Sequence, residues 1–77
     1  MFPVEEIQRL LEEGLPGARV SVSGDGHHFE AEVVSAVFAG KSKVQRHQMV
    51  YAALGSRMGN EIHALSFKTL TPDECPA

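Results

Sequence analysis

The sequence predicts an α+β domain, a two-layer sandwich in which a three-stranded sheet is covered on one face by helices. The first observation is length: 77 residues leave room for one core, so we expect a single domain spanning residues 1–77. The second is periodicity, because two stretches repeat apolar residues at helical spacing and three alternate as strands do. The third is the order α-β-β-α-β, in which every element has one apolar side to bury against the other layer.

The first helix is expected from about residue 3 to residue 14. Apolar side chains recur there at helical spacing, while glutamates occupy the other side. Pro3 suits a first helical turn, and Gly14 followed by Pro16-Gly17 ends the helix. The apolar positions are Val4, Ile7, Leu10, Leu11 and Leu15.

Two strands joined by a tight turn are expected next. Apolar and polar residues alternate over residues 18–23 and again, in a longer run, over residues 29–37. Gly24-Asp25-Gly26 lies between the two runs and favours a chain reversal, because glycine and aspartate tolerate positive φ. The pattern therefore predicts a β-hairpin.

A second helix is expected from about residue 43 to residue 58, with a kink near Gly55. Ser42 is a suitable N-cap, and Gly59-Asn60 ends the pattern. An apolar stripe is the side by which a helix packs on the core. Here the stripe steps by three and four residues and includes one histidine: Val44, His47, Val50, Tyr51, Leu54 and Met58.

A third strand is expected over residues 62–69, where apolar and polar residues alternate again. The segment that follows, Thr71-Pro72-Asp73-Glu74, has the residues of a helix cap and one short helical turn. The strand is therefore expected to end in a capped turn.

Composition excludes several classes of protein. A net charge of −3 argues against a surface that grips nucleic acid over its whole extent, although it permits a local basic patch. The single cysteine, Cys75, cannot form an intramolecular disulfide and fits a reducing compartment. The first residues lack the pattern of a secretory signal, and no apolar run approaches the ~20 residues of a membrane span. We therefore expect a cytoplasmic protein without a membrane segment.

No arrangement of residues suggests catalysis. Neither a Ser-His-Asp nor a Cys-His arrangement can be argued from the sequence. Cys75 lies two residues from the last residue of the sequence, where chain ends fray and a nucleophile is hard to position. We expect a binding protein rather than an enzyme.

Three segments, taken together, resemble the BolA family. They are Gly24-Asp25-Gly26-His27-His28-Phe29, the run from Phe38 to Tyr51, and the run from Ile62 to Pro72. The first is most similar to the acid-stress-associated bacterial branch. The resemblance implies a fold like the type II KH domain. It also implies a non-enzymatic adaptor that partners a monothiol glutaredoxin in iron–sulfur cluster trafficking, iron homeostasis and stress response. One departure is Cys75, which stands where the family commonly has an aromatic residue.

The resemblance also implies metal ligands. It makes His63, at the start of the third strand, a ligand to a [2Fe–2S] cluster that is shared with the glutaredoxin, whose cysteine and glutathione supply the remaining thiolates. The second ligand from this chain is His27 or His28. Adjacent residues of an extended chain point to opposite sides, so we expect one of the two, and His28 directly precedes Phe29 as in the similar branch. The alternative is that all three are solvated or hydrogen-bonded histidines that bind no metal.

A basic cluster is expected at the start of the second helix, formed by Lys41, Lys43 and Arg46. The simplest interpretation is a solvated face. The cluster also suits an acidic or glutathione-bearing partner, toward which Arg46 would project, or DNA. BolA proteins are also described as transcription regulators, so a small DNA-binding regulator with a KH-like surface is the second hypothesis. His47 is interpreted as structural, a partly buried histidine that ties the helix to the preceding loop.

Overall fold

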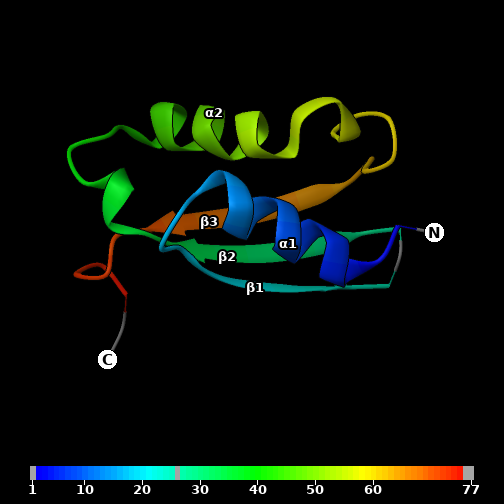
Figure 1. The fold of residues 1–77 in the computed structure, drawn as a ribbon, viewed down its shortest axis with the longest axis horizontal. Helices are drawn as coiled ribbons and strands as arrows, with labels where there is room; N and C mark the ends of the chain where they lie inside the picture. The colour runs from blue at the N-terminus through cyan, green and yellow to red at the C-terminus, as the bar shows by residue number, and fades with distance from the viewer. Residues whose placement is uncertain (1, 26, 76–77) are drawn as a thin grey trace.

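The fold is a three-stranded sheet with two α-helices, as expected. A computed structural model describes residues 2–25 and 27–75 (Figure 1). The elements follow in the order α1 (Val4–Gly14), β1 (Arg19–Gly24), β2 (Phe29–Val34), the short 3₁₀ helix η1 (Ala36–Phe38), α2 (Lys43–Leu54), the 3₁₀ helix η2 (Gly55–Arg57) and β3 (Leu65–Leu70). No helix among the described residues is long and apolar enough to cross a membrane.

The order of the strands in the sheet is β1-β2-β3, so β2 is central and β3 is an edge strand. β1 and β2 form the expected antiparallel hairpin, in which Gly24 pairs with Phe29. β2 and β3 are parallel, with Phe29 opposite Leu65 and Val34 opposite Leu70. Because the pair is parallel, β2 and β3 begin at the same end of the sheet. In Figure 1 this is the end at which the chain's N-terminus also lies.

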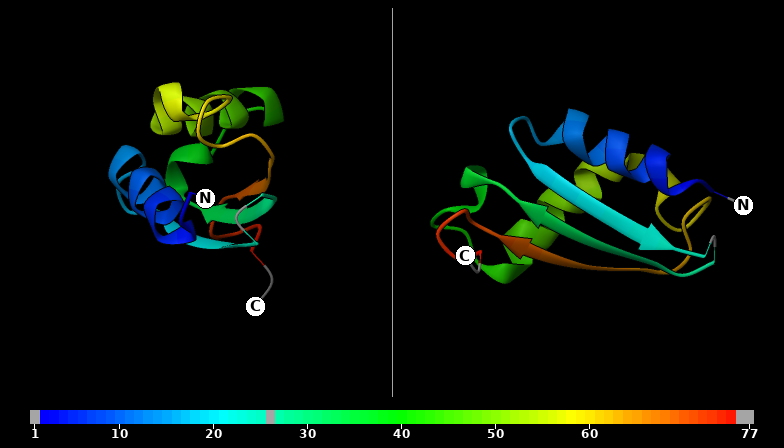
Figure 2. Two further views of the ribbon diagram at one scale, coloured as in Figure 1. Left: turned by 90° about the vertical axis from the view of Figure 1, so that its right-hand side faces the viewer. Right: turned by 90° about the horizontal axis from the view of Figure 1, so that it is seen from below.

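Both helices cover one face of the sheet, which gives the expected two layers (Figure 2). The core lies between the layers, because alternate strand residues turn their apolar side chains toward the helices. The opposite face is largely polar, and Ser21, Glu32 and Lys68 form one row across it. The side chains fully withdrawn from solvent are Ile7, Leu11, Val33, Phe38, Val50, Leu54 and Ile62.

Three element boundaries differ from those expected. β2 ends at Val34 rather than Val37, because the Ser35 side chain accepts a hydrogen bond from the Val37 N–H and begins η1. α2 ends at Leu54, since Gly55 has φ of +62° and the chain continues as η2. β3 begins at Leu65 rather than residue 62, and Ile62 forms an isolated bridge with Met58 instead.

The buried face of α2 also differs from the predicted stripe. Val50 and Leu54 are buried as expected, but Val44 is 67% exposed and Tyr51 is 45% exposed. The helix is turned so that Met49 and Ala53 pack against the core beside them. Tyr51 instead packs edge-on against Phe67 of β3, with ring centroids 5.5 Å apart. Tyr51 of the predicted stripe therefore lies at the edge strand β3 rather than in the core.

The close approach of the two helices predicts an unusual response at Gly14. Replacing an exposed glycine within a helix by alanine usually raises the free energy of unfolding by about 1 kcal/mol. A Cβ on Gly14 would lie 2.5 Å from the Ala53 Cβ and 2.9 Å from its Cα, so we expect Gly14→Ala to lower the free energy of unfolding by about 1–3 kcal/mol in urea titrations. Adding Ala53→Gly should restore much of that loss; a Gly14→Ala variant more stable than the parent would contradict the packing.

Candidate functional site

The three candidate ligand histidines lie at one end of the sheet. His27 and His28 immediately precede β2, and His63 lies two residues before β3. The two segments are tied together, because the Phe29 N–H donates a hydrogen bond to the Ala64 carbonyl oxygen at 2.9 Å. All three histidines are exposed. The parallel pairing of β2 with β3 therefore brings together residues that are distant in the sequence.

The hairpin holds its two histidines through Asp25. One carboxylate oxygen, Oδ1, accepts the backbone N–H of His27 and that of His28, each at 2.9 Å. These two hydrogen bonds lower the pKa of Asp25 below its ordinary value, and the one from His28 has the larger effect. The carboxylate therefore stays charged beside the histidines. The third residue of the predicted reversal, Gly26, lies outside the described residues.

The register leaves both hairpin histidines as candidates. Counting back two residues from the pair Phe29–Leu65 places His27 opposite His63, and counting back one places His28 opposite Ala64. Residues 27–28 and 63–64 lie outside the regular strands, however, so the alternation of side chains is not imposed on them. Both remain within one or two residues of the backbone link to β3.

The donor set fits a metal group that is completed by another molecule. Within residues 2–25 and 27–75, no group of three or more histidine, cysteine or acidic side chains is arranged to hold a metal ion. Cys75 lies at the other end of the sheet, in a depression lined also by Arg19 and Val34, where β1 begins and β2 ends. Neutral imidazole suits iron, but a [2Fe–2S] cluster needs four protein or thiol ligands. One or two imidazoles here would thus form half of a shared site.

Arg46 does not project away from the protein as expected. Its side chain is 13% exposed and forms an ion pair with Glu74, with Nη1 2.7 Å from Oε1. Its Nε donates to the Lys41 carbonyl oxygen and its Nη1 to that of Thr69. Arg46 therefore fastens the loop before α2 to the end of β3, and an arginine in these contacts is not free to reach a partner. The sequence alone gave no sign of this long-range contact.

Glu74 completes the capped turn expected after β3. Its Oε1 accepts the Thr71 N–H at 2.8 Å, and the Thr71 Oγ1 accepts the Glu74 N–H at 3.3 Å. The pKa of Glu74 is lowered from 4.5 to about 2, mainly by the hydrogen bond from the Arg46 side chain and next by the hydrogen bond from the Thr71 backbone. The segment makes the one short helical turn that was expected, because the Thr71 carbonyl oxygen accepts the N–H of Glu74 at 3.0 Å and that of Cys75 at 3.2 Å.

His47 is half-buried, but its partner is not the preceding loop. Its ring packs on Phe67 of β3, with centroids 4.5 Å apart and planes tilted by 55°. The contact between α2 and the preceding loop that was expected of His47 is made by Arg46, whose Nε donates a hydrogen bond to the Lys41 carbonyl oxygen. His47 instead joins α2 to the edge of the sheet.

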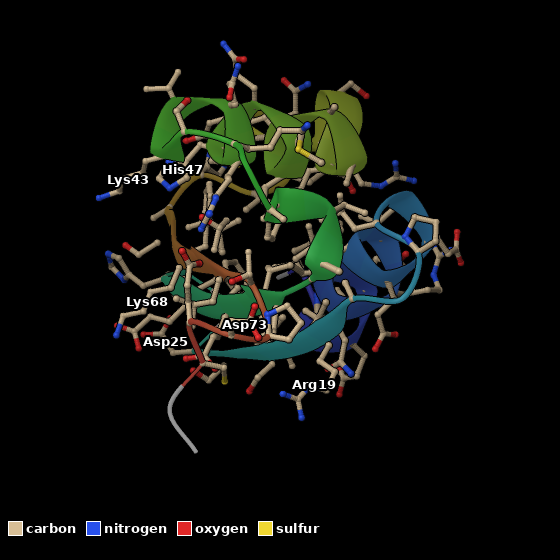
Figure 3. All side chains as sticks on the ribbon, turned by 90° about the vertical axis from the view of Figure 1, so that its left-hand side faces the viewer. Arg19, Asp25, Lys43, His47, Lys68 and Asp73 are labelled. Carbon is tan, nitrogen blue, oxygen red and sulfur yellow. The ribbon has the colours of Figure 1, made fainter. Side chains whose placement is uncertain are left out.

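A basic groove runs between the start of α2 and the end of β3. The expected cations Lys41 and Lys43 line it, together with His47, and both lysines are exposed. Lys68 of β3 lines the same groove, which sequence reasoning missed. The alternation of residues 65–68 could have marked Lys68 as exposed, but its approach to α2 depends on the fold. Figure 3 shows Lys43, His47 and Lys68 along one side of the molecule.

Known proteins share both the sequence and the fold. Residues 11–74 match the family model for BolA-like protein. The acid stress protein IbaG of Escherichia coli (strain K12) is 44% identical over 70 residues, which cover 90% of this chain and 83% of that protein.

Two further relatives agree with this. The DNA-binding transcriptional regulator BolA of Haemophilus influenzae is 43% identical over 54 residues, covering 70% of this chain and 52% of that protein. The structure of a BolA homologue from Coxiella burnetii superimposes with a TM-score of 0.86 at 52% identity, covering 96% of each chain. The match to the family model spans most of the chain, and the fold agrees over nearly all of it. This chain is a member of the BolA-like family.

Proposed function

We propose that this chain is a non-enzymatic, cytoplasmic adaptor that binds a monothiol glutaredoxin and shares a [2Fe–2S] cluster with it. His63 and one histidine of the hairpin, His28 or His27, are the ligands from this side. The observation that carries the proposal is the juxtaposition of these exposed histidines where parallel β2 and β3 begin. Membership of the BolA-like family supports it.

The residues of this chain suit one half of such a site. The hydrogen bond from Phe29 to Ala64 fixes the two segments beside each other, and Asp25 fixes the hairpin backbone. The exposed imidazoles can therefore meet a partner's surface without rearrangement of the strands. The glutaredoxin cysteine and glutathione would supply thiolates, and histidine in place of cysteine raises the potential at which such a cluster accepts an electron.

The direct test is to co-express this chain with a monothiol glutaredoxin and isolate the mixed complex by size-exclusion chromatography. We expect a coloured complex whose iron content and visible spectrum differ from those of the glutaredoxin alone. A colourless mixed complex would refute cluster sharing while leaving partner binding intact. Failure of the two proteins to elute together would refute the adaptor role itself.

The choice between His27 and His28 predicts an asymmetric result. If His28 is the ligand, His28→Ala should reduce the iron content of the mixed complex to well below that of the parent, whereas His27→Ala should leave it close to the parent value. Both variants keep the backbone N–H groups that Asp25 accepts, so the hairpin is preserved in each. The reverse pattern would assign His27, and no loss in either variant would exclude a hairpin ligand.

DNA binding is a second candidate, because lysines line the groove beside β3 and the Haemophilus influenzae relative is called a DNA-binding regulator. Phosphate neutralisation makes such binding steeply dependent on salt. Fluorescence anisotropy with a labelled duplex should then show binding that weakens strongly as salt rises. Absence of binding at low salt would remove this candidate.

A further inference from the structure

The outer edge of β3 offers backbone groups to another strand. The Phe29 N–H bonds to the Ala64 carbonyl, and the Ser35 N–H bonds to the Leu70 carbonyl, so the even-numbered residues of this segment direct their backbone groups to β2. The odd-numbered residues Leu65, Phe67 and Thr69 therefore direct theirs outward. Arg46 reaches the Thr69 carbonyl oxygen from that outer side. An edge of this kind is a template for pairing with a further strand.

The surroundings of this edge are basic on one side and apolar on another. Lys41, Lys43 and Lys68 line the adjoining groove, and none of them forms an ion pair with another residue of the described ranges. On α2, Val44 is 67% exposed and Tyr51 is 45% exposed, and Tyr51 packs on Phe67 in the middle of β3. Lysines and exposed apolar side chains thus lie beside the outward backbone groups of Leu65 and Phe67, while Arg46 already occupies the Thr69 carbonyl oxygen.

We propose that the edge of β3 binds an extended acidic segment of a partner protein, which adds to the sheet as a fourth strand. Side chains of an added strand alternate between the two faces of the sheet. Those on the helical face would meet Val44 and Tyr51, and those on the open face would meet Lys68. The segment therefore alternates apolar and acidic residues, and Lys43, which lines the same groove as Lys68, adds positive charge near the end of β3.

Charge favours this occupant over a second copy of the chain. Two copies joined edge to edge at β3 would bring their lysine-lined grooves together, and opposed like charges are destabilising. Nucleic acid would use the lysines but would leave the outward N–H and C=O groups and the exposed apolar side chains without strand-like partners. The groove adjoins Phe67–Leu70, toward the opposite end of β3 from His63, so the proposal does not depend on metal binding.

The test uses a fluorescent peptide of alternating glutamate and valine, followed by anisotropy and by amide hydrogen exchange of the ¹⁵N-labelled protein. Binding should slow exchange at the outward amides of Leu65, Phe67 and Thr69 and leave Ser66 and Lys68, which face β2, nearly unchanged. The same peptide, N-methylated at alternate amides, keeps its charge but loses the backbone N–H donors along one of its two edges. It should bind at least about tenfold more weakly.

Charge reversal gives a matched pair of variants. Lys43→Glu with Lys68→Glu should weaken binding of the peptide by about tenfold or more at low salt. Arg19→Glu changes the same kind of charge on β1, at the other edge of the sheet, and should leave affinity within about twofold. Equal binding of the N-methylated peptide, or protection of amides outside β3, would overturn the proposal. So would binding of a single-stranded oligonucleotide in the groove without binding of the peptide.

Discussion

Replacing His63 with alanine is expected to remove most of the visible absorbance and iron from the mixed complex with a monothiol glutaredoxin. His63 is exposed beside the start of β3, and the described residues offer few substitutes there. Cys75, the only thiol of the chain, is at the other end of the sheet. Loss of one of the ligands leaves an iron open to water. Even changes to residues that only support a ligand reduce metal affinity by roughly 10–100-fold, so loss of the ligand itself should cost at least as much.

The His63→Ala result needs a control that separates ligation from folding. His63→Cys supplies a thiolate at the same position, so it should retain iron while shifting the spectrum and lowering the reduction potential. The His63 side chain is exposed and lies outside the strands, so neither substitution should change the urea midpoint of the isolated chain appreciably. Iron content and spectrum that are the same in His63→Ala and the parent would exclude His63 as a ligand.

The fold could be predicted because local patterns agree with it. The alternation around Val20 and Phe29, the glycines at the reversal and the Ser42 cap each favour the element that forms there. In α2, the Ser42 side chain accepts the Gln45 N–H at 3.1 Å and the Gln45 side chain accepts the Ser42 N–H at 2.9 Å. A capping box of this kind is written in the local sequence, so this helix start was predictable to the residue.

What could not be predicted depends on contacts between distant segments. The spacing of Val44 and Tyr51 is helical, but which side of α2 is buried depends on where α1 and β3 lie. Arg46 is one of several cations near α2, and only the fold shows that Glu74 is within its reach. The histidines were identified by resemblance, whereas their meeting at one end of the sheet follows from the parallel register of β2 and β3.

Arg46→Ala is expected to cause the largest loss of stability among the polar substitutions considered. The guanidinium joins the loop before α2, the end of β3 and the turn after it, and its side chain is only 13% exposed. It also lies over the buried ring of Phe38, 5.9 Å from the centroid. Removing these partly buried contacts should lower the free energy of unfolding by about 2–4 kcal/mol. A chain of this size has roughly 4–12 kcal/mol in total.

Conservative variants show which property of Arg46 matters. Arg46→Lys keeps the charge but lacks the planar fork that bonds both Glu74 oxygens and the two carbonyls, so it should recover less than half of the loss. Lys41→Ala changes a neighbouring exposed cation and should alter stability by no more than about 0.5 kcal/mol. The urea midpoints of Arg46→Ala, Arg46→Lys and Lys41→Ala test both expectations. An Arg46→Ala variant as stable as Lys41→Ala would contradict the structural role.

The acid response gives an independent measure of the same contact. The pKa of Glu74 is about 2 in the folded chain against an ordinary 4.5, so its ionised form stabilises the fold. That stabilisation is fully present above pH 4.5 and is lost as the pH falls through about 2. Arg46 is the first cause of the shift, and Arg46→Ala leaves only the bonds to Thr71. The free energy of unfolding should therefore fall less steeply between about pH 5 and about pH 2.5 in Arg46→Ala than in the parent. Parallel slopes in the two proteins would show that Glu74 keeps its low pKa without Arg46, and that the ion pair is not what stabilises its charge.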